Sequence, residues 1–400
     1  MSAEYDIVVV GAGHGGVALV QHLRRSGFDG AICLVGDEPH APYQRPPLTK
    51  DFLLDACGMD ALSLGLDAAA LDVILLQGQR VAAISPDARK VRLEDGATLG
   101  YGKLVLATGS RPRRLAGIDR ARPFYLTCLD DCLALKARLP AITRAVVIGG
   151  GFIGLEVASA LRTLGRAVTV VEAQERLLAR AATNALSDYL RDLHLRQGVE
   201  LMVGAIVADA SPQGVTLRDG TFLAADAVIV GVGALPNAEL AEQAGLACDD
   251  GILVDAFMRT SDPHILAIGD CSRHPNVYGP RSPFRLESVQ NAGDQAVVAA
   301  ETIMGRERPY ESLPTFWSDQ YDARIAIAGI SQDHDRVAVR GNPADNSFSV
   351  FAWRDGKLVS VESVNRPKDQ RVARRLILDT ALTPEQVMDE TFDLRAALPA

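Results

Sequence analysis

The sequence predicts an α/β fold with two Rossmann-like domains and a C-terminal α+β domain. A glycine fingerprint, GxGxxG, occurs twice, each time after a short apolar run rich in β-branched residues and before a helical pattern. From about residue 314 the pattern changes to short β-type runs and one terminal helical segment. At about 150 residues per domain, a chain of 400 residues also fits two or three domains.

Composition excludes several other classes of protein. Hydrophobic residues make up 48% and charged residues 23% of the chain, close to an ordinary globular average. The formal net charge of −9 gives no general attraction to nucleic acid or to an anionic membrane. The longest apolar runs fall far short of the roughly 20 residues of a spanning helix, and no cationic segment precedes the first of them. We therefore expect a cytoplasmic protein without nucleic-acid or membrane partners.

The cysteines do not predict structural disulfides, and no metal site is expected. They are scattered through a long chain that shows no secretory signal. Cys128 and Cys132 would share one face of a helix, but a redox dithiol is normally a CxxC pair. We interpret both as packing residues. The cysteines are Cys33, Cys57, Cys128, Cys132, Cys248 and Cys271.

The first fingerprint lies in a complete βαβ pattern. The run Ile7–Val10 is typical of a strand buried on both faces, and the glycine-rich stretch 11–16 follows it directly. A helix over 17–23 and a strand over 31–35, leading to Asp37, come next. The glycines permit a tight turn and let backbone N–H groups approach a pyrophosphate, and the acidic residue accepts hydrogen bonds from an adenosine ribose. The pattern predicts a dinucleotide site.

The second fingerprint repeats this arrangement. A strand over 145–148 is followed by GGGFIG at 149–154, a helix over 155–164 and a strand over 167–171 that leads to Glu172. A dehydrogenase with one cofactor needs a single unit of this kind. Two units imply two dinucleotides, of which FAD with a nicotinamide nucleotide is the commonest pair.

Other strand ends and turns support this organisation. The stretch 103–109 ends in Ala-Thr-Gly, 227–233 ends in a GxG motif, and 260–270 ends in Gly-Asp. Asp-Gly pairs at 95–96 and 219–220 lie between β-type runs and predict hairpins. In the last region we expect strands over 324–328, 336–340, 348–353 and 358–364 and a helix from Gln370 to about Leu378.

Three segments carry a family resemblance: PYQRPPLTK at 42–50, RLESVQNA at 285–292 and FWSDQY at 316–321. With the two fingerprints, they make the chain similar, from residue 5 to about 375, to oxygenase-coupled NADH:ferredoxin reductases. These are the reductases of the putidaredoxin-reductase and biphenyl-dioxygenase-reductase type, within the glutathione-reductase structural class. The resemblance implies a split FAD domain at 1–110 and 240–313, an inserted NADH domain at 111–239 and a C-terminal interface domain at 314–400.

The same resemblance assigns FAD-binding residues. Asp37 would bind the adenosine ribose, Val81 would contact the adenine through its backbone, and Asp270 would bond the ribityl chain. The FAD set that the resemblance implies is Gly11, Gly13, Gly15, Gly16, Asp37, Arg45, Lys50, Val81, Ala107, Thr108, Gly109, Asp270, Val289 and Trp317.

The resemblance also implies how the flavin ring and the nicotinamide are held. Lys50 would lie beside the isoalloxazine and pair with Glu156, which would sit by the nicotinamide; these two are the implied catalytic residues. A helix beginning at Val289 would point its N-terminus at the pyrimidine end of the flavin, and Trp317 would cover part of the ring. The family usually has Arg where this chain has Thr127, at a position that helps to hold FAD. The implied NAD set is Gly149, Gly151, Ile153, Gly154, Glu172, Arg180 and Gly233.

The function that follows from the resemblance is NADH:ferredoxin oxidoreduction. Electrons would pass from NADH through FAD to a [2Fe-2S] ferredoxin that supplies a monooxygenase or a Rieske-type dioxygenase. A rubredoxin reductase, or another pyridine-nucleotide flavoprotein reductase of this fold, is the alternative, and a non-catalytic signalling flavoprotein is a second. A disulfide reductase is disfavoured because the stretch 40–50 contains no cysteine. Glu172 favours NADH over NADPH, although Arg176 and Arg180 nearby could soften that choice.

A basic run near the C-terminus is a candidate docking surface for the ferredoxin. Residues 366–375 contain five basic residues and one acidic residue, a local balance of 5 − 1 = +4 in an acidic protein. Two-iron ferredoxins are typically acidic, so such a run could steer them, although a solvated helix face explains it equally well. The residues are Arg366, Lys368, Arg371, Arg374 and Arg375, with Arg306 and Arg308 as an extension.

Overall fold

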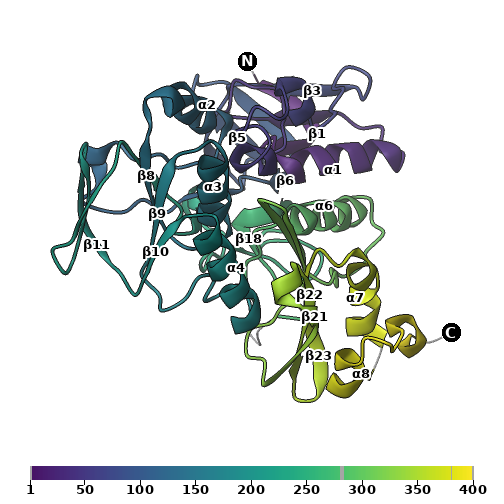
Figure 1. The fold of residues 1–400 in the computed structure, drawn as a ribbon. Coiled ribbons are helices and arrows are strands. Elements are labelled where there is room, and N and C mark those ends of the chain that lie inside the picture. Colours follow the sequence, from purple (N-terminus) through teal and green to yellow (C-terminus); the bar gives the residue numbers. More distant parts are fainter. Residues whose placement is uncertain (1, 280–282, 380, 399–400) are drawn as a thin grey trace. The chain divides into compact units, whose positions relative to one another are not determined.

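The computed structural model describes residues 2–279, 283–379 and 381–398 and divides the chain into two compact units. Unit 1 comprises residues 1–44, 59–111 and 234–314, and unit 2 comprises residues 45–58, 112–233 and 315–400. Figure 1 labels the elements of both. Each unit contains a sheet with a core of parallel strands and a glycine-rich loop after the first of them, and residues 315–400 add an antiparallel sheet with helices. The predicted fold class is confirmed.

Unit 1 is built on a sheet in the order β3-β2-β1-β6-β5-β4, in which β17 pairs with the C-terminal half of β6. The pairs of β1 with β2 and with β6 are parallel, and β4, β5 and the start of β6 form an antiparallel meander. Helices α1 and α6 lie side by side (Figure 1). The strands are β1 (Ser2–Val10), β2 (Ile32–Val35), β3 (Val73–Leu76), β4 (Val81–Ser85), β5 (Lys90–Leu93), β6 (Thr98–Leu106), β7 (Ser110–Pro112), β15 (Ala234–Pro236), β16 (Ile252–Leu253), β17 (Ile265–Ala267) and β18 (Ser272–Arg273), and the helices are α1 (His14–Arg25), α5 (Glu239–Gln243) and α6 (Val289–Ile303).

The parallel sheet of unit 2 has the order β10-β9-β8-β14, and a three-stranded antiparallel sheet, β11-β12-β13, follows β10 in the chain. All residues of β14 are buried, as the continuous apolar pattern predicts. The strands are β8 (Arg144–Ile148), β9 (Ala167–Glu172), β10 (Glu200–Val203), β11 (Val207–Ser211), β12 (Gly214–Leu217), β13 (Phe222–Ala224) and β14 (Ala227–Val230), and the helices are α2 (Leu129–Arg138), α3 (Phe152–Thr163) and α4 (Asn184–Arg196).

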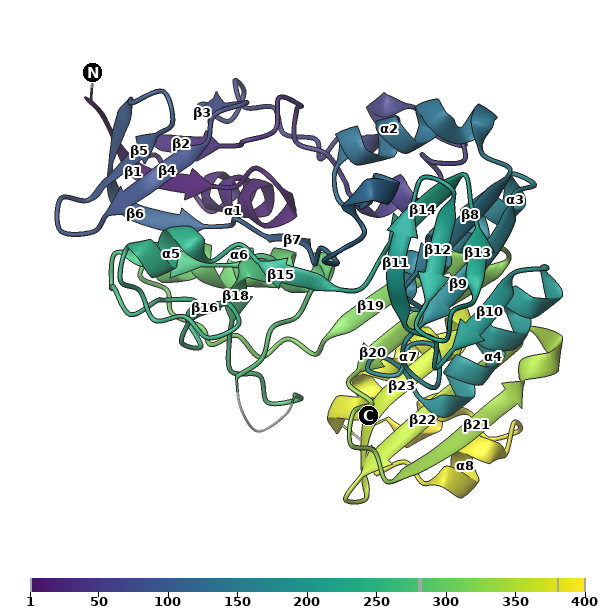
Figure 2. The same cartoon turned by 90° about the vertical axis from the view of Figure 1, so that its left-hand side faces the viewer.

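The rest of unit 2 is an antiparallel sheet in the order β19-β20-β23-β22-β21, with α7 and α8 beside it (Figure 2). Helix α7 packs on β23 and β20 through its apolar face, because Val372, Ala373 and Leu376 are buried. The strands are β19 (Thr315–Gln320), β20 (Ala323–Gly329), β21 (Arg336–Asn342), β22 (Ser347–Arg354) and β23 (Lys357–Val364), and the helices are α7 (Pro367–Asp379) and α8 (Pro384–Met388).

The predicted elements are confirmed with small shifts at their ends. Helix α1 begins at His14 rather than at Val17, because the last glycines of the fingerprint already have helical backbone. Strand β17 covers only Ile265–Ala267, and Asp270 lies in the 3₁₀ turn Gly269–Cys271 that follows. Strand β19 was not predicted from periodicity. The two Asp-Gly hairpins are present as β5–β6 and β12–β13. Among the described residues, no helix is long and apolar enough to cross a membrane.

Candidate active site

The loop after β1 has the geometry that a dinucleotide pyrophosphate needs. A Cβ at Gly11, whose φ is +115°, would lie 2.0 Å from the carbonyl oxygen of Ala107, so only glycine fits this turn. A Cβ at Gly16 would lie 2.0 Å from the carbonyl oxygen of Gly11, so helix and strand pack at a distance that excludes any side chain. At Gly13, by contrast, no described atom lies within 4 Å of that position. The N-terminus of α1 is therefore open where a phosphate would approach.

The end of β6 is tied to the loop that contains Asn237. The side-chain amide of Asn237 donates to the carbonyl oxygen of Thr108 over 2.8 Å, and the Thr108 hydroxyl donates to the carbonyl oxygen of Asn237 over 2.7 Å. The backbone N–H of Asn237 also donates to the carbonyl oxygen of Gly109 over 2.9 Å. These three bonds fix the Ala107–Gly109 turn beside the first phosphate loop.

Helix α6 holds the Gly-Asp turn in place. The side-chain oxygen of Gln295 accepts hydrogen bonds from the backbone N–H of Gly269 over 2.6 Å and from the Ser272 hydroxyl over 2.9 Å. Asp270 accepts a hydrogen bond from the Ser110 hydroxyl over 3.0 Å. This carboxylate is thus fixed in unit 1, in the unit that carries the first phosphate loop.

Helix α6 begins at Val289, where the sequence predicts a helix N-terminus. The hydroxyl oxygen of Ser288 caps it by accepting from the backbone N–H of Asn291 over 3.1 Å. Asn291 is fully buried, and its side chain bonds the Leu286 carbonyl oxygen and the Tyr310 hydroxyl. The helix start is therefore held by several hydrogen bonds and presents the positive end of its dipole.

The acidic residue after β2 lies at the carboxyl end of the parallel strands. Asp37 is exposed there, whereas the neighbouring Glu38 already accepts a hydrogen bond from the Tyr43 hydroxyl. Val81 is buried at the start of β4. Of the two acids in this position, Asp37 is the one whose side chain faces solvent, as binding to a ribose requires.

The two glycines of the first loop make a matched pair for a mutational test. Gly11→Ala is expected to lower the free energy of unfolding by roughly 2 kcal/mol or more, because its Cβ meets a backbone carbonyl at a positive φ. Gly13→Ala is expected to leave the thermal midpoint of the apoprotein nearly unchanged and to weaken dinucleotide binding. Thermal unfolding and equilibrium titration with FAD measure the two effects. A Gly13→Ala variant with undiminished FAD affinity would contradict this placement of the pyrophosphate.

The second phosphate loop, in unit 2, repeats the geometry of the first. A Cβ at Gly149, where φ is +111°, would lie 2.3 Å from the carbonyl oxygen of Gly231, and one at Gly154 would lie 2.1 Å from that of Gly149. Around Gly151 no described atom lies within 4 Å of the corresponding position. The carboxylate of Glu172 accepts backbone N–H bonds from Gly150 over 2.6 Å and from Gln174 over 2.7 Å. The acid is therefore fixed beside the loop.

Three further predicted NAD residues lie around this loop in unit 2. Ile153 is on the first turn of α3 and is 51% exposed, which is unusual for a large apolar side chain at a helix start. Arg180 is exposed, and a Cβ at Gly233 would lie 3.9 Å from a terminal nitrogen of its guanidinium group. The structure thus brings Arg180 and Gly233 together. Arg176 instead donates to backbone carbonyls of its own segment, including that of Ala179 over 2.9 Å.

A buried ion pair joins the two predicted catalytic residues in unit 2. Lys50 Nζ lies 2.9 Å from Oε1 of Glu156, a carboxylate that is only 5% exposed. Two hydroxyls complete its partners: Thr49 donates to Oε2 and Ser318 donates to Oε1, each over 2.6 Å. One cation and two hydroxyl donors therefore surround the Glu156 carboxylate on helix α3.

The Ser318 hydroxyl belongs to a longer buried chain of hydrogen bonds. The Gln320 amide nitrogen donates to Ser318 Oγ over 3.1 Å, and Gln320 Oε1 lies 2.9 Å from Nε2 of His194. Burial lowers the pKa of His194, which favours the neutral ring. Because Gln320 Oε1 can only accept, the contact is consistent with donation from Nε2–H. The Tyr321 hydroxyl is 3.4 Å from the other ring nitrogen. Each hydrogen bond in this series is directed toward Glu156. The Glu156 carboxylate is therefore the last acceptor of the series.

The neighbouring residues of unit 2 show where a ring system could stack. Trp317 is 37% exposed on β19, although indole groups are usually more deeply buried. The residue before it, Phe316, packs against Phe152 of α3 with 4.6 Å between ring centroids. Thr127 immediately precedes the N-cap of helix α2 and donates to the Asp131 carboxylate through its backbone N–H and its hydroxyl. The Thr127 carbonyl oxygen accepts from the Arg45 guanidinium over 3.1 Å. The groups of Thr127 thus form hydrogen bonds at the start of α2 and with Arg45.

The cysteines do not add a redox centre to the candidate site. Cys128 is the N-cap of α2, and Cys132 lies inside that helix with its thiol donating to the Leu48 carbonyl oxygen over 3.1 Å. Burial raises the pKa of Cys132 to about 11, which suppresses the thiolate that redox chemistry needs. All six cysteines are free thiols. Among the described residues, no group of His, Cys, Asp and Glu could hold a metal ion.

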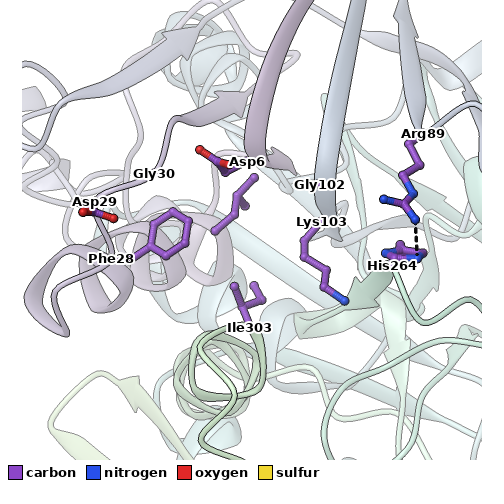
Figure 3. Close-up of a pocket in the computed structure, with 10 residues that line it drawn as sticks. Asp6, Phe28, Asp29, Gly30, Arg89, Gly102, Lys103, His264 and Ile303 are labelled. Atoms are coloured by element: carbon purple, nitrogen blue, oxygen red, sulfur yellow. Dashed lines mark hydrogen bonds between the residues drawn. The ribbon is translucent and has the colours of Figure 1, made fainter.

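Unit 1 also has an open depression of about 510 Å³ (Figure 3). It is lined by Asp6, Phe28, Lys103 and His264 among others, and Arg89 hydrogen-bonds His264 there over 2.9 Å. Asp6 precedes the buried part of β1, whereas the phosphate loop follows the end of that strand. Ligands of parallel α/β sheets bind at the carboxyl ends of the strands. The depression therefore lies away from the end of the sheet at which the sequence predicts the dinucleotide.

Sequence reasoning missed Thr49, Ser318 and Asn237. Thr49 and Ser318 stand next to Lys50 and Trp317 in segments that the sequence singled out, so adjacency was the available signal. Their convergence on Glu156 depends on the packing of α3 against β19, which no local pattern encodes. Asn237 follows the GxG strand end directly after a proline, which was the signal for a structured turn.

Comparison with known proteins supports this description. Residues 5–296 match the family model of the pyridine nucleotide-disulphide oxidoreductases, and residues 315–398 match a reductase C-terminal model. The chain is 41% identical to a ferredoxin–NAD(P)(+) reductase of a Sphingomonas species, over 98% of this chain and 97% of that protein.

Solved structures are similar over the whole chain. The ferredoxin reductase for the CYP199A2 system from Rhodopseudomonas palustris has a TM-score of 0.95 and 42% identity, covering 98% of this chain and 100% of that one. The covalent putidaredoxin reductase–putidaredoxin complex has a TM-score of 0.94 and 38% identity, with 99% of each chain covered.

Proposed function

We propose that this chain, which belongs to the pyridine nucleotide-disulphide oxidoreductase family, is an FAD-dependent ferredoxin–NAD(P)(+) reductase that passes electrons to a [2Fe-2S] ferredoxin serving an oxygenase. The observation that carries the proposal is the presence of two phosphate loops of matching geometry, one in each unit. The proposed FAD domain comprises residues 1–110 and 240–313, the NADH domain residues 111–239 and the interface domain residues 314–400. We place the protein in the cytoplasm, where NADH is available.

The residues of the site have distinct proposed roles. FAD, when bound, would accept a hydride from the nicotinamide and pass the two electrons one at a time to an iron–sulfur partner. Positioning dominates such a hydride transfer, so the two phosphate loops act mainly as anchors. We propose that the positive end of α6 stabilises negative charge at the pyrimidine end of the flavin. Lys50, held by Glu156, would supply a cation beside the isoalloxazine.

The test of this function is spectroscopic and kinetic. The purified protein is expected to be yellow with non-covalent FAD and to be bleached by NADH without oxygen. NADH-dependent reduction of cytochrome c should depend on an added two-iron ferredoxin. A protein that binds no FAD on reconstitution contradicts the proposal, and turnover with rubredoxin but with no ferredoxin of a panel supports the rubredoxin-reductase alternative. Steady-state NADH oxidation with any iron–sulfur acceptor excludes a purely signalling role.

Coenzyme choice gives a further prediction. Glu172 is fixed at the end of β9 by two backbone N–H groups, so a 2′-phosphate on the adenosine would meet its negative charge. We expect kcat/KM for NADH to exceed that for NADPH by about tenfold or more. Glu172→Gln keeps the shape and removes the charge, so this variant should narrow the ratio. Equal efficiency of the wild-type protein with both coenzymes would show that Glu172 does not select the coenzyme.

A further inference from the structure

A buried carboxylate in the C-terminal sheet has no part in the reaction described above. Glu362 lies on the central strand β23 and has no solvent-exposed surface. Burial raises its pKa, and hydrogen bonds from Thr183 and Ser331 oppose that rise. The Thr183 hydroxyl donates to Oε2 over 2.6 Å, and its backbone N–H donates to both carboxylate oxygens over 3.0 and 3.2 Å. Burying a carboxylate costs free energy unless hydrogen-bond donors satisfy it. The burial of Glu362 among these donors therefore calls for a structural explanation.

The partner residue, Thr183, is the N-cap of α4. Its hydroxyl oxygen accepts from the backbone N–H of Leu186 over 3.4 Å while the hydroxyl hydrogen is given to Glu362. A single side chain therefore caps the helix and ties its first residue to the C-terminal sheet. The start of α4 is therefore hydrogen-bonded to β23 through Glu362.

The segment before α4 is anchored at its other end to the second phosphate loop. The backbone N–H of Leu178 donates to the carbonyl oxygen of Gly150 over 3.0 Å, and Leu178 has a positive φ of 52°. The Arg176 guanidinium, just before the first anchor, donates to the carbonyl oxygens of Ala179 and Ala182 over 2.9 and 3.1 Å. Residues 176–183 are thus a compact loop held between Gly150 and Glu362.

Arg180 lies in the middle of this loop and is exposed. The side-chain amide of Gln332, in the segment after β20, donates to the Arg180 carbonyl oxygen over 2.9 Å. The Arg180 side chain is exposed and extends to the neighbourhood of Gly233, at the end of β14. Two side chains of the C-terminal sheet region therefore contact this segment: Gln332 contacts the carbonyl oxygen of Arg180, an arginine assigned to the nicotinamide dinucleotide, and Glu362 contacts the residue three positions after it.

We propose that Glu362 and Gln332 are positioning residues for Arg180, through which the C-terminal domain sets the affinity for NADH. The inference rests on the proposed function and on the assignment of Arg180 to the NAD-binding residues, with the added premise that Arg180 contacts the adenosine half of the coenzyme. Contacts to that half are equally strong in the ground state and in the transition state for hydride transfer. Loss of the positioning should therefore raise KM for NADH and leave kcat nearly constant.

The experiment compares the holoenzyme with Gln332→Ala, Glu362→Gln and Arg180→Gln variants. KM and kcat for NADH are measured with ferricyanide as acceptor, and the Kd of NAD⁺ is measured by calorimetry. We expect Gln332→Ala and Glu362→Gln each to raise KM and Kd by about fivefold, with kcat within about twofold of wild type. Gln332 contacts the loop from an exposed position, so its variant remains informative if Glu362→Gln does not fold.

Asp369→Asn is the matched control. Asp369 is also a buried carboxylate of the C-terminal region, and its described partners, Ser349 and Arg366, both lie in residues 315–400. This variant loses a similar buried interaction and should keep the wild-type KM for NADH. An equal rise of KM in Asp369→Asn would show a general loss of stability and would overturn the inference.

A double-mutant cycle tests the route through Arg180. If Glu362 and Gln332 act by positioning Arg180, their substitution in the Arg180→Gln background should add little. Full additivity overturns the inference. Wild-type KM in folded Gln332→Ala and Glu362→Gln variants, together with a raised KM in Arg180→Gln, also overturns it and leaves the proposed function intact. A wild-type KM in Arg180→Gln removes the premise, because Arg180 then does not bind the coenzyme.

Discussion

Replacing Lys50 by Met is expected to slow the reduction of bound FAD by NADH by about a hundredfold. In unit 2 the Lys50 ammonium group pairs with the buried Glu156 carboxylate. Methionine keeps the unbranched stem and removes the charge, so the variant loses the proposed cation beside the flavin. Glu156 retains hydrogen bonds from the Thr49 and Ser318 hydroxyls, and we therefore expect the fold and the FAD content to persist.

Anaerobic stopped-flow absorbance in the flavin band measures this rate directly. Lys136→Met is the matched control, because Lys136 also pairs with a carboxylate of unit 2, that of Asp55, at 2.5 Å. The control should reduce its FAD at the wild-type rate. A folded, FAD-loaded Lys50→Met variant with unchanged reduction kinetics would mean that Lys50 takes no part in hydride transfer.

The second large effect is expected on the exposed face of α7. Lys368, Arg371, Arg374 and Arg375 are exposed there, at spacings of three and four residues that place them along the outer side of the helix. Arg366 is half-buried and pairs with Asp369 at 3.0 Å and with Glu390 at 3.4 Å. The predicted basic run therefore comprises four residues exposed on α7 and one half-buried arginine that precedes the helix.

Substituting Gln for Arg371, Arg374 and Arg375 should raise KM for an acidic two-iron ferredoxin by about tenfold at low ionic strength and flatten its salt dependence. Turnover from NADH to ferricyanide should remain at the wild-type value, because a small acceptor needs no docking surface.

A charge-matched control replaces Arg120, Arg122 and Arg218, which are exposed in residues 112–233. This control changes the net charge of the protein by the same amount without altering α7. Unaltered ferredoxin kinetics in the α7 variant at low ionic strength would mean that the ferredoxin docks elsewhere. An equal change in both triple variants would mean that only the overall charge matters.

Local sequence patterns were sufficient for the elements that hold the two dinucleotides. A buried parallel strand, a glycine turn and a following helix are each encoded within about thirty residues, because the constraints on them are steric and act between near neighbours. Gly11 and Gly149 illustrate this, since each has a positive φ and a backbone carbonyl where a side chain would stand. The acidic residues after β2 and β9 follow from the same spacing.

The partners of the buried charges could not be read from such patterns. Glu156 accepts hydrogen bonds from Thr49 and Ser318, which are 107 and 162 residues away in the sequence. Glu362 accepts a hydrogen bond from Thr183, 179 residues away. Hydrogen bonds of this range depend on how whole elements pack, and one hydroxyl or carboxylate looks the same in the sequence whether it is solvated or buried.

What the sequence by itself determined is the pair of phosphate loops, the Lys50–Glu156 pair through family resemblance, and the fold class. Only the tertiary structure decided that Arg366 is neutralised by Asp369, that Asn237 ties down the end of β6, and that Glu362 anchors the loop carrying Arg180. The physical reason is the separation in the sequence between the residues that interact. Turn geometry and strand burial are properties of a short segment, whereas the charge state and the orientation of a buried side chain depend on donors supplied by distant parts of the chain.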